Sequence, residues 1–216
     1  MQSAGFEKLM DRRRVEKIYS AYSGIYDLIF GGVLEPRIVE GVRAMGVKKG
    51  DRVLEVGVGT GLSLSHYPHN CEVIGVDLSK KMIEKAQKKV RALALDHVFL
   101  NVMNAEHLGF PDETFNHVFA AFVITTTPDP RKILSEIARV VKKGGQVVLL
   151  NHFMNSHPLV GKIEGLMNPI FTRLGWRMDV ILDHLLEDVP LHVVSVCKFR
   201  KMDPWKIFFL SKQRHP

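Results

Sequence analysis

The sequence predicts an α/β fold, in which a seven-stranded, mostly parallel sheet has one antiparallel edge strand and helices on both faces. Two observations predict this fold. Short runs rich in β-branched residues alternate with helix-period segments from residue 51 to 151, which is typical of a doubly wound parallel sheet. Two further β-rich runs near the C-terminus are joined by a link short enough for a hairpin, which would add the antiparallel edge.

The expected strands and helices follow from these runs. Strands are expected at residues 52–56, 72–76, 98–101, 116–121 and 146–151 and, for the hairpin, at 191–199 and 205–210. Ser79 can cap a helix that runs to about residue 94, because apolar residues then fall on one face. A second helix is expected from residue 130 to 141, ended by Gly144 and Gly145.

Length and composition favour one folded domain. The chain has 216 residues, of which 46% are hydrophobic and 25% charged, and this excludes a disordered or fibrous protein. Within it, residues 1–45 are expected to form an N-terminal helical segment that faces substrate or membrane, and residues 46–216 the core. No apolar run reaches the roughly 18 residues that span a bilayer, and the N-terminus is too polar for a signal peptide. The expected compartment is therefore the cytoplasm.

The cysteines and the net charge limit the chemistry further. Cys71 and Cys197 are the two cysteines, which cannot build a disulfide scaffold, and no Cys-x-x-Cys pair suggests a zinc site. Both lie in apolar runs and are expected to be buried thiols, and no metal is expected. The net charge of +7 favours anionic partners, either nucleic acid or acidic lipid, without deciding between them.

A glycine-rich loop, residues 57–61, follows the first strand and opens a helix. Glycines let the backbone approach a ligand closely, and ligands of open α/β sheets bind at the carboxyl ends of the strands. Leu62 stands where a nicotinamide dinucleotide fingerprint requires a third spaced glycine. Asp77 ends the second strand, where a carboxylate can bind both ribose hydroxyls of a nucleoside. The alternative is that Asp77 caps the next helix, with Ser79 as the rival cap.

These motifs resemble those of the Rossmann-like S-adenosylmethionine-dependent methyltransferases. Residues 53–61 resemble the first motif of that family, and residues 73–79 with Met82 resemble the second. Residues 104–111 resemble the stretch that borders the adenine, and residues 139–145 the turn before the fifth strand. The resemblance implies S-adenosyl-L-methionine as the methyl donor and S-adenosyl-L-homocysteine as the product.

Two positions depart from the family pattern. Asn104 and His117 occupy positions often held by aspartate. An asparagine can still bind the adenine amino group through its carbonyl oxygen, and we expect His117 to lie inside or beside the strand rather than in catalysis. The cofactor-binding residues that the resemblance implies are Tyr19, Glu55, Gly57, Val58, Gly59, Thr60, Gly61, Asp77, Leu78, Ser79, Met82, Asn104, Ala105, Glu106 and Ala121.

A narrower resemblance concerns both flanks of the core. Residues 19–31, 122–125, 151–153 and 174–177 resemble segments of the bacterial phosphatidylethanolamine N-methyltransferases of the Rhodobacter type. Quinone methyltransferases share a similar Tyr-Asp pair near the start of the chain. The resemblance implies a phospholipid N-methyltransferase that acts on phosphatidylethanolamine and on its mono- and dimethylated forms. A quinone-type C- or O-methyltransferase and a non-enzymatic cofactor-binding adaptor remain as alternatives.

The chemistry of amine methylation suggests the remaining site residues. The acceptor amine must lose a proton before it attacks, and His152 or Tyr26 could orient or relay that proton. Aromatic faces can bind a methylated ammonium, and an arginine can bind a lipid phosphate. The substrate-binding candidates are Tyr22, Tyr26, Ile124, Trp176 and Arg177. Four of the site residues have a plainer alternative: core packing for Tyr22, groove filling for Trp176, a surface charge for Arg177 and a structural role for His152.

The positive charge is assigned to lipid rather than to nucleic acid. No Asn/Asp-Pro-Pro-Tyr-type loop follows the fourth strand, where residues 120–123 read Ala-Ala-Phe-Val, so nucleic-acid methylation is not expected. Apolar residues and the arginine cluster within residues 6–14, together with Lys198, Arg200, Lys201 and Lys206, could bind an anionic bilayer. We therefore expect reversible peripheral association with the inner face of the cytoplasmic membrane. The sequence leaves the oligomeric state open.

Overall fold

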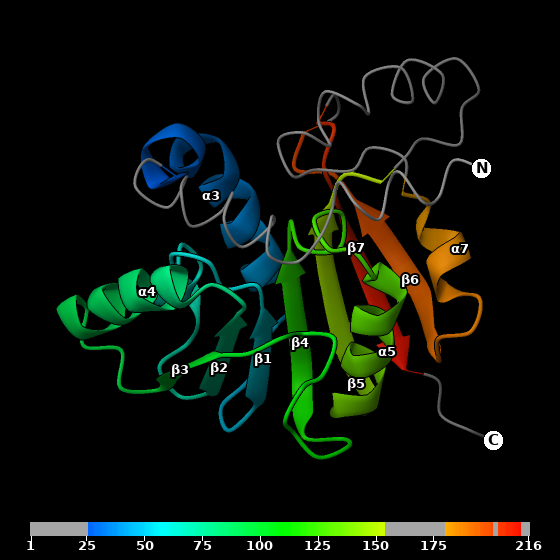
Figure 1. The fold of residues 1–216 in the computed structure, drawn as a ribbon, viewed down its shortest axis with the longest axis horizontal. Coiled ribbons are helices and arrows are strands. Elements are labelled where there is room, and N and C mark those ends of the chain that lie inside the picture. Colours follow the sequence, from blue (N-terminus) through cyan, green and yellow to red (C-terminus); the bar gives the residue numbers. More distant parts are fainter. Residues whose placement is uncertain (1–25, 154–179, 201–202, 213–216) are drawn as a thin grey trace.

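The computed structural model describes residues 26–153, 180–200 and 203–212 (Figure 1). In these ranges one seven-stranded sheet has the order β3-β2-β1-β4-β5-β7-β6. Its strands are β1 (Arg52–Val56), β2 (Glu72–Asp77), β3 (Val98–Val102), β4 (Phe115–Ala121), β5 (Val141–Asn151), β6 (Leu191–Cys197) and β7 (Lys206–Lys212). The helices are α3 (Tyr26–Ala44), α4 (Lys80–Ala92), α5 (Pro130–Val140) and α7 (Leu182–Leu186), with a 3-10 turn, η1 (Leu64–His66).

The strand directions confirm the predicted sheet. β1 is parallel to β2 and β4, β2 is parallel to β3, and β4 is parallel to β5. β7 is antiparallel to both β5 and β6, so the hairpin lies at the edge of the sheet as predicted. The antiparallel strand itself is second from that edge. β7 takes the inner position because it carries the apolar residues that both cores bury, Ile207, Phe208 and Leu210, whereas β6 is mostly exposed.

Helices cover both faces of the sheet, as predicted, and each face has its own hydrophobic core. One core joins α5 and α7 to sheet residues such as Leu54 and Leu149. The other core joins α3 and α4 to Val53 and Val148, the residues that precede Leu54 and Leu149 in the sequence. Adjacent residues of a strand point to opposite faces, so the same short runs supply both cores. Figure 1 shows α5 and α7 toward the β5–β6 half of the sheet, and α4 beside β2 and β3.

The helix ends agree with the predicted caps, with one difference. Ser79 Oγ accepts a hydrogen bond from Met82 N at 3.4 Å, which caps α4. α5 ends at Val140, and Val141 already belongs to β5, five residues before the predicted start of that strand. The extra residues fit because Gly144 adopts a φ of 72° and the pairing with β4 shifts register between Phe115 and His117.

Three further expectations can be compared with the described residues. Cys71 is buried as expected, but Cys197 is exposed, because it ends the outermost strand β6. His117 lies inside β4, as expected, and its Nε2 is 3.0 Å from Asp51 Oδ2, at the amino end of the sheet. Across the described ranges, no helix combines the length and apolar composition that crossing a bilayer requires.

Candidate functional site

A pocket opens at the carboxyl edge of the parallel strands. It is bounded by the loops after β1, β2, β3 and β4, by α3 and by the first turn of α4. The predicted cofactor-binding residues that line it are Glu55, Gly57, Val58, Gly59, Thr60, Asp77, Leu78, Ser79, Met82, Asn104, Ala105, Glu106 and Ala121. Gly61 is not part of the lining, and Tyr19 lies outside the described residues. The topology therefore gathers the predicted motifs at one edge.

The glycine loop follows β1 and folds back onto β2. The backbone nitrogens of Gly57 and Val58 both donate to the Val76 carbonyl, at 2.8 and 3.0 Å. Gly57 has a φ of 71°, and a Cβ there would lie 2.1 Å from Val123 Cγ2, so no other residue fits. At Gly61 a Cβ would lie 2.7 Å from Leu64 Cδ1. Gly61 therefore allows η1 to pack closely, and Gly57 allows Val123, in the loop after β4, to do the same.

Asp77 is the acidic group at the end of β2. Its Oδ2 accepts from Gly59 N at 2.9 Å and its Oδ1 accepts from Ser79 N at 2.8 Å. Burial raises the pKa of the carboxyl above 3.8, although these two hydrogen bonds oppose the shift. Among the described residues no cation pairs with it, and each oxygen has a second lone pair. Two adjacent hydroxyls, such as those of a ribose, fit this carboxylate, while Ser79 fills the capping role.

Glu55 lies beneath the same loop and is almost completely buried. Ser63 Oγ lies 2.6 and 2.7 Å from its two carboxylate oxygens, and Tyr67 OH donates to Oε2 at 2.8 Å. Burial raises the pKa of Glu55 from 4.5 to about 7, although both hydroxyls stabilise the charged form. Sequence reasoning missed Ser63 and Tyr67. Their only signal is that a buried acid needs donors close by in the chain.

The loop after β3 forms the wall that the sequence assigns to the adenine. Asn104 Oδ1 accepts from Glu106 N at 3.1 Å, so the amide that was expected to bind adenine also shapes the loop. Met103 N donates to the carbonyl of Asp77 at 2.9 Å, which ties this wall to the end of β2. A nucleoside in the pocket would thus lie between two connected loops.

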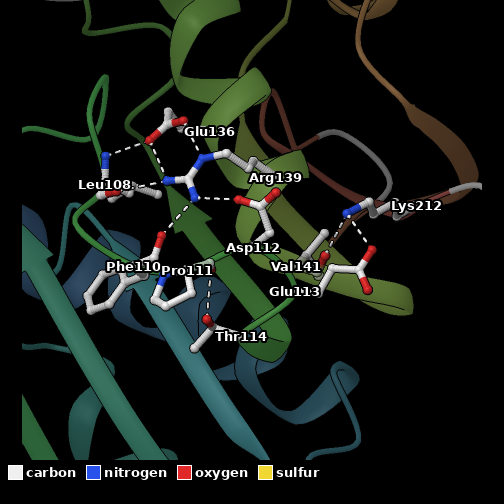
Figure 2. A network of polar contacts seen from close by, with 10 residues as sticks. All are labelled: Leu108, Phe110, Pro111, Asp112, Glu113, Thr114, Glu136, Arg139, Val141 and Lys212. Atoms are coloured by element: carbon white, nitrogen blue, oxygen red, sulfur yellow. Dashed lines mark hydrogen bonds and ion pairs between the residues drawn. The ribbon is translucent and has the colours of Figure 1, made fainter.

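Arg139, near the end of α5, fastens the continuation of that loop (Figure 2). Its Nη2 donates to the Leu108 carbonyl at 2.8 Å and its Nη1 to the Phe110 carbonyl at 2.7 Å. Its Nε donates to Glu136 Oε1 at 2.7 Å, and Glu136 Oε2 accepts from Leu108 N at 2.7 Å. The hydrogen bond from Arg139 lowers the pKa of Glu136. The motif predicted only a turn here, and the role of Glu136 was missed.

The predicted substrate-binding and proton-transfer residues whose side chains the structure describes are not gathered at the pocket. His152 follows β5, and its Nδ1 lies 2.9 Å from the Pro204 carbonyl, outside the pocket lining. Ile124 is completely buried in the core that packs against α5 and does not line the pocket. Tyr26 is the first residue of α3, but its side chain lies outside the described part. Tyr22, Trp176 and Arg177 also lie outside the described residues.

No metal cluster complements this pocket in the described ranges, where no three His, Cys, Asp or Glu side chains are grouped to hold an ion. The reactive groups that line the pocket are carboxylates and hydroxyls. Together with the glycine loop, they can bind a nucleoside and orient a second substrate.

Comparisons with known proteins agree with this geometry. Residues 54–149 match a family described as "Methyltransferase domain". The phosphatidylethanolamine N-methyltransferase of Cereibacter sphaeroides is 40% identical over 210 residues, which is 95% of this chain and 100% of that protein. A demethylmenaquinone methyltransferase of Bacillus cytotoxicus is 36% identical over 145 residues, 63% of this chain and 61% of that protein.

Solved structures show the same fold. A Thermotoga maritima S-adenosylmethionine-dependent methyltransferase, described as a possible histamine N-methyltransferase, superimposes with a TM-score of 0.69. The match covers 92% of this chain and 100% of that one at 21% sequence identity. The likeness therefore concerns the fold.

Proposed function

The chain belongs to the S-adenosylmethionine-dependent methyltransferases, and from that premise we propose that it methylates the amine of phosphatidylethanolamine and its mono- and dimethylated forms. One observation carries the proposal. Similarity to the Cereibacter sphaeroides enzyme extends over 95% of the chain, so it includes both flanks of the core. Similarity to the Bacillus cytotoxicus quinone enzyme covers 63%.

The donor would occupy the pocket at the carboxyl edge. S-adenosylmethionine supplies an activated methyl group on a sulfonium, so this chain has mainly to position donor and acceptor in line. Asp77 would bind the ribose hydroxyls, the loop after β3 would border the adenine, and residues 57–61 would let the backbone approach the donor. The pocket suits this donor, because Asp77 holds two acceptor oxygens inside it.

The acceptor amine must be neutral when it attacks. We assign the role of accepting the proton that the amine loses to His152, with Tyr26 as the second candidate. The Pro204 carbonyl, 2.9 Å away, can only accept, so His152 Nδ1 would donate to it and Nε2 of the neutral ring would accept the proton. We assign the methylated ammonium to the aromatic rings of Tyr22 and Trp176 and the lipid phosphate to Arg177.

Methyl transfer to defined acceptors tests the proposed function. Purified protein is incubated with labelled donor and either phosphatidylethanolamine vesicles or a quinone extract, and the products are separated. We expect label in mono-, di- and trimethylated head groups. Label in the quinone alone would support the quinone-type alternative, and donor binding without transfer to either acceptor would support an adaptor. His117→Asn, at the opposite end of the sheet, is the matched active control.

We further propose that the enzyme reaches its lipid by reversible binding to the anionic inner face of the cytoplasmic membrane. The expected segment at residues 6–14 lies outside the described residues, but α4 offers a second basic surface. Lys80, Lys81, Lys88 and Arg91 are exposed on α4, whose only acid is Glu84. The helix starts at the pocket, because its cap Ser79 and first-turn Met82 line it.

Two charge-matched double variants test the role of α4. Lys81→Glu/Lys88→Glu and Lys49→Glu/Lys143→Glu lower the net charge equally, but the second pair lies at the amino end of the sheet. Each cation near an anionic surface contributes about 1 kcal/mol, so the α4 variant should bind phosphatidylglycerol vesicles at least about tenfold more weakly. Equal losses would reject α4 as the surface. Absence of wild-type binding at low salt would reject membrane association.

A further inference from the structure

A buried ion pair joins α3 to the link between β6 and β7. Arg37 Nε and Nη2 lie 2.8 and 2.7 Å from Asp203 Oδ2. The Asp203 side chain is completely buried and that of Arg37 is 13% exposed. Arg37 Nη1 also donates to the Val33 carbonyl, one turn earlier on the helix. All three guanidinium nitrogens are therefore engaged, which fixes the orientation of the side chain.

Aromatic rings enclose the same guanidinium. Its carbon lies 4.8 Å from the ring centre of Trp205 and 5.4 Å from that of Phe199. The Trp205 ring meets Phe122 edge to face, with ring centres 6.0 Å apart. Phe122 lines the pocket and has a φ of 59°, which is unfavourable for a bulky residue unless its surroundings hold it. The stack thus extends from Arg37 to the pocket wall.

Asp203 also shapes the link that contacts His152. Its Oδ1 accepts from Trp205 N at 3.0 Å, and its own N–H donates to the Arg200 carbonyl at 2.9 Å. These bonds fix the turn around Pro204, whose carbonyl is 2.9 Å from His152 Nδ1. One chain of contacts therefore runs from Arg37 through Asp203 and Pro204 to the proposed proton acceptor.

The position of α3 matters for the same site. Leu34 and Ile38, three residues before and one residue after Arg37, both line the pocket. Tyr26, the second candidate for proton transfer, starts the helix about three turns earlier. A rotation of α3 would move these residues relative to His152. The ion pair is suited to prevent it, because the Arg37 fork can meet Asp203 in few orientations.

We propose that Arg37 is a positioning residue, which sets α3, Phe122 and His152 relative to one another and so fixes the acceptor side of the site. This proposal rests on the proposed function, since it concerns the acceptor of the methyl group. Apolar packing of Leu34, Ile38 and Val42 already holds α3 on the sheet. A buried ion pair generally adds little stability beyond what apolar residues would provide, so its contribution here is orientation.

Arg37→Lys tests the proposal with the least disturbance. Lysine keeps the charge but lacks the planar fork and the stacking surface. We expect turnover with lipid to fall about tenfold or more, while the dissociation constant for S-adenosylhomocysteine, measured by calorimetry, changes less than about threefold. The 15N signal of His152, assigned with His152→Asn, should shift. The matched control is Arg131→Lys, an exposed arginine on α5 that pairs with Asp188.

A reversed pair, Arg37→Asp/Asp203→Arg, should recover part of the turnover and of the His152 signal relative to Asp203→Asn. The proposal is overturned if Arg37→Lys lowers the melting temperature but leaves turnover, lipid KM and the His152 signal unchanged. It is also overturned if donor affinity falls in proportion to turnover. The His152 signal can be measured without a lipid substrate, so the proposal is tested even if wild-type protein fails to methylate phosphatidylethanolamine.

Discussion

The donor side and the acceptor side of this site are held together over very different distances along the chain. The proposed donor side comprises the loops after β1, β2 and β3. The contacts of its first two loops are local: Glu55 to Ser63 spans eight residues and Asp77 to Gly59 spans 18. The acceptor side comprises α3, the ends of β4 and β5, and the β6–β7 link. There, His152 to Pro204 spans 52 residues and Arg37 to Asp203 spans 166.

This difference suggests how one fold can keep a donor and change its acceptor. Local loops form whenever the sheet forms, so the core alone should suffice to form a nucleoside-binding site. Contacts between distant segments depend on the flanks, which can vary while the core stays intact. The comparisons fit this division, because the quinone enzyme of Bacillus cytotoxicus matches 63% of the chain and the Cereibacter sphaeroides enzyme matches 95%.

The largest expected effect is on the donor side. Asp77→Ala removes the acceptor for both ribose hydroxyls, and each hydrogen bond to a charged group contributes about 2 kcal/mol, so S-adenosylhomocysteine should bind about a thousandfold more weakly in calorimetry. Asp129→Ala is the matched control, since it removes an aspartate that caps α5 instead. Unchanged affinity in Asp77→Ala would remove the ribose role of this carboxylate.

A pH-dependent effect should reveal the network beneath the loop. The pKa of Glu55 is raised from 4.5 to about 7 in the folded protein, so the folded state keeps a proton that the unfolded state loses. The contribution of Glu55 to the free energy of unfolding is complete below pH 4.5 and is lost as the pH rises through 7. Glu55→Gln should therefore raise the free energy of unfolding relative to wild type between these values, by up to about 3 kcal/mol.

Denaturant unfolding across this pH range measures the Glu55 effect. Asp77 also has a raised pKa, so the informative quantity is the difference between Glu55→Gln and wild type at each pH. Glu84→Gln, which changes an exposed carboxyl on α4, serves as the control. Parallel stability curves for wild type and Glu55→Gln would show that the pKa of this carboxyl is the same in the folded and the unfolded protein.

The smallest expected effect concerns the loop after β3, which belongs to the proposed donor side but is bound by Arg139, 31 residues from Leu108 along the chain. Arg139→Leu removes the bonds to the Leu108 and Phe110 carbonyls (Figure 2), so the loop that borders the adenine should lose its fixed position. We expect about tenfold weaker binding of S-adenosylhomocysteine, which corresponds to about 1.4 kcal/mol. Arg131→Leu on the same helix should leave the affinity unchanged. Equal affinity in both variants would make the Arg139 contacts irrelevant to the donor.

The sequence predicted the loops that line the pocket because their determinants are local. Gly57 and Asp77, from the motifs at residues 53–61 and 73–79, line the pocket, and Ser79 caps α4 as predicted. The side of Ile124 could not be predicted, because an apolar residue after a strand can face either the pocket or the core, and here it faces the core. Nothing near Arg37 in the sequence indicates a partner 166 residues away, so the acceptor side required the structure.

The central claim is that the donor binds in this pocket with its ribose on Asp77. A crystal structure of the complex with S-adenosylhomocysteine tests it most directly. We expect both ribose hydroxyls within hydrogen-bond distance of the Asp77 carboxylate, with the nucleoside between the 57–61 loop and Asn104. A nucleoside bound elsewhere on the protein, or a crevice closed by the protein's own side chains under saturating ligand, would contradict the account.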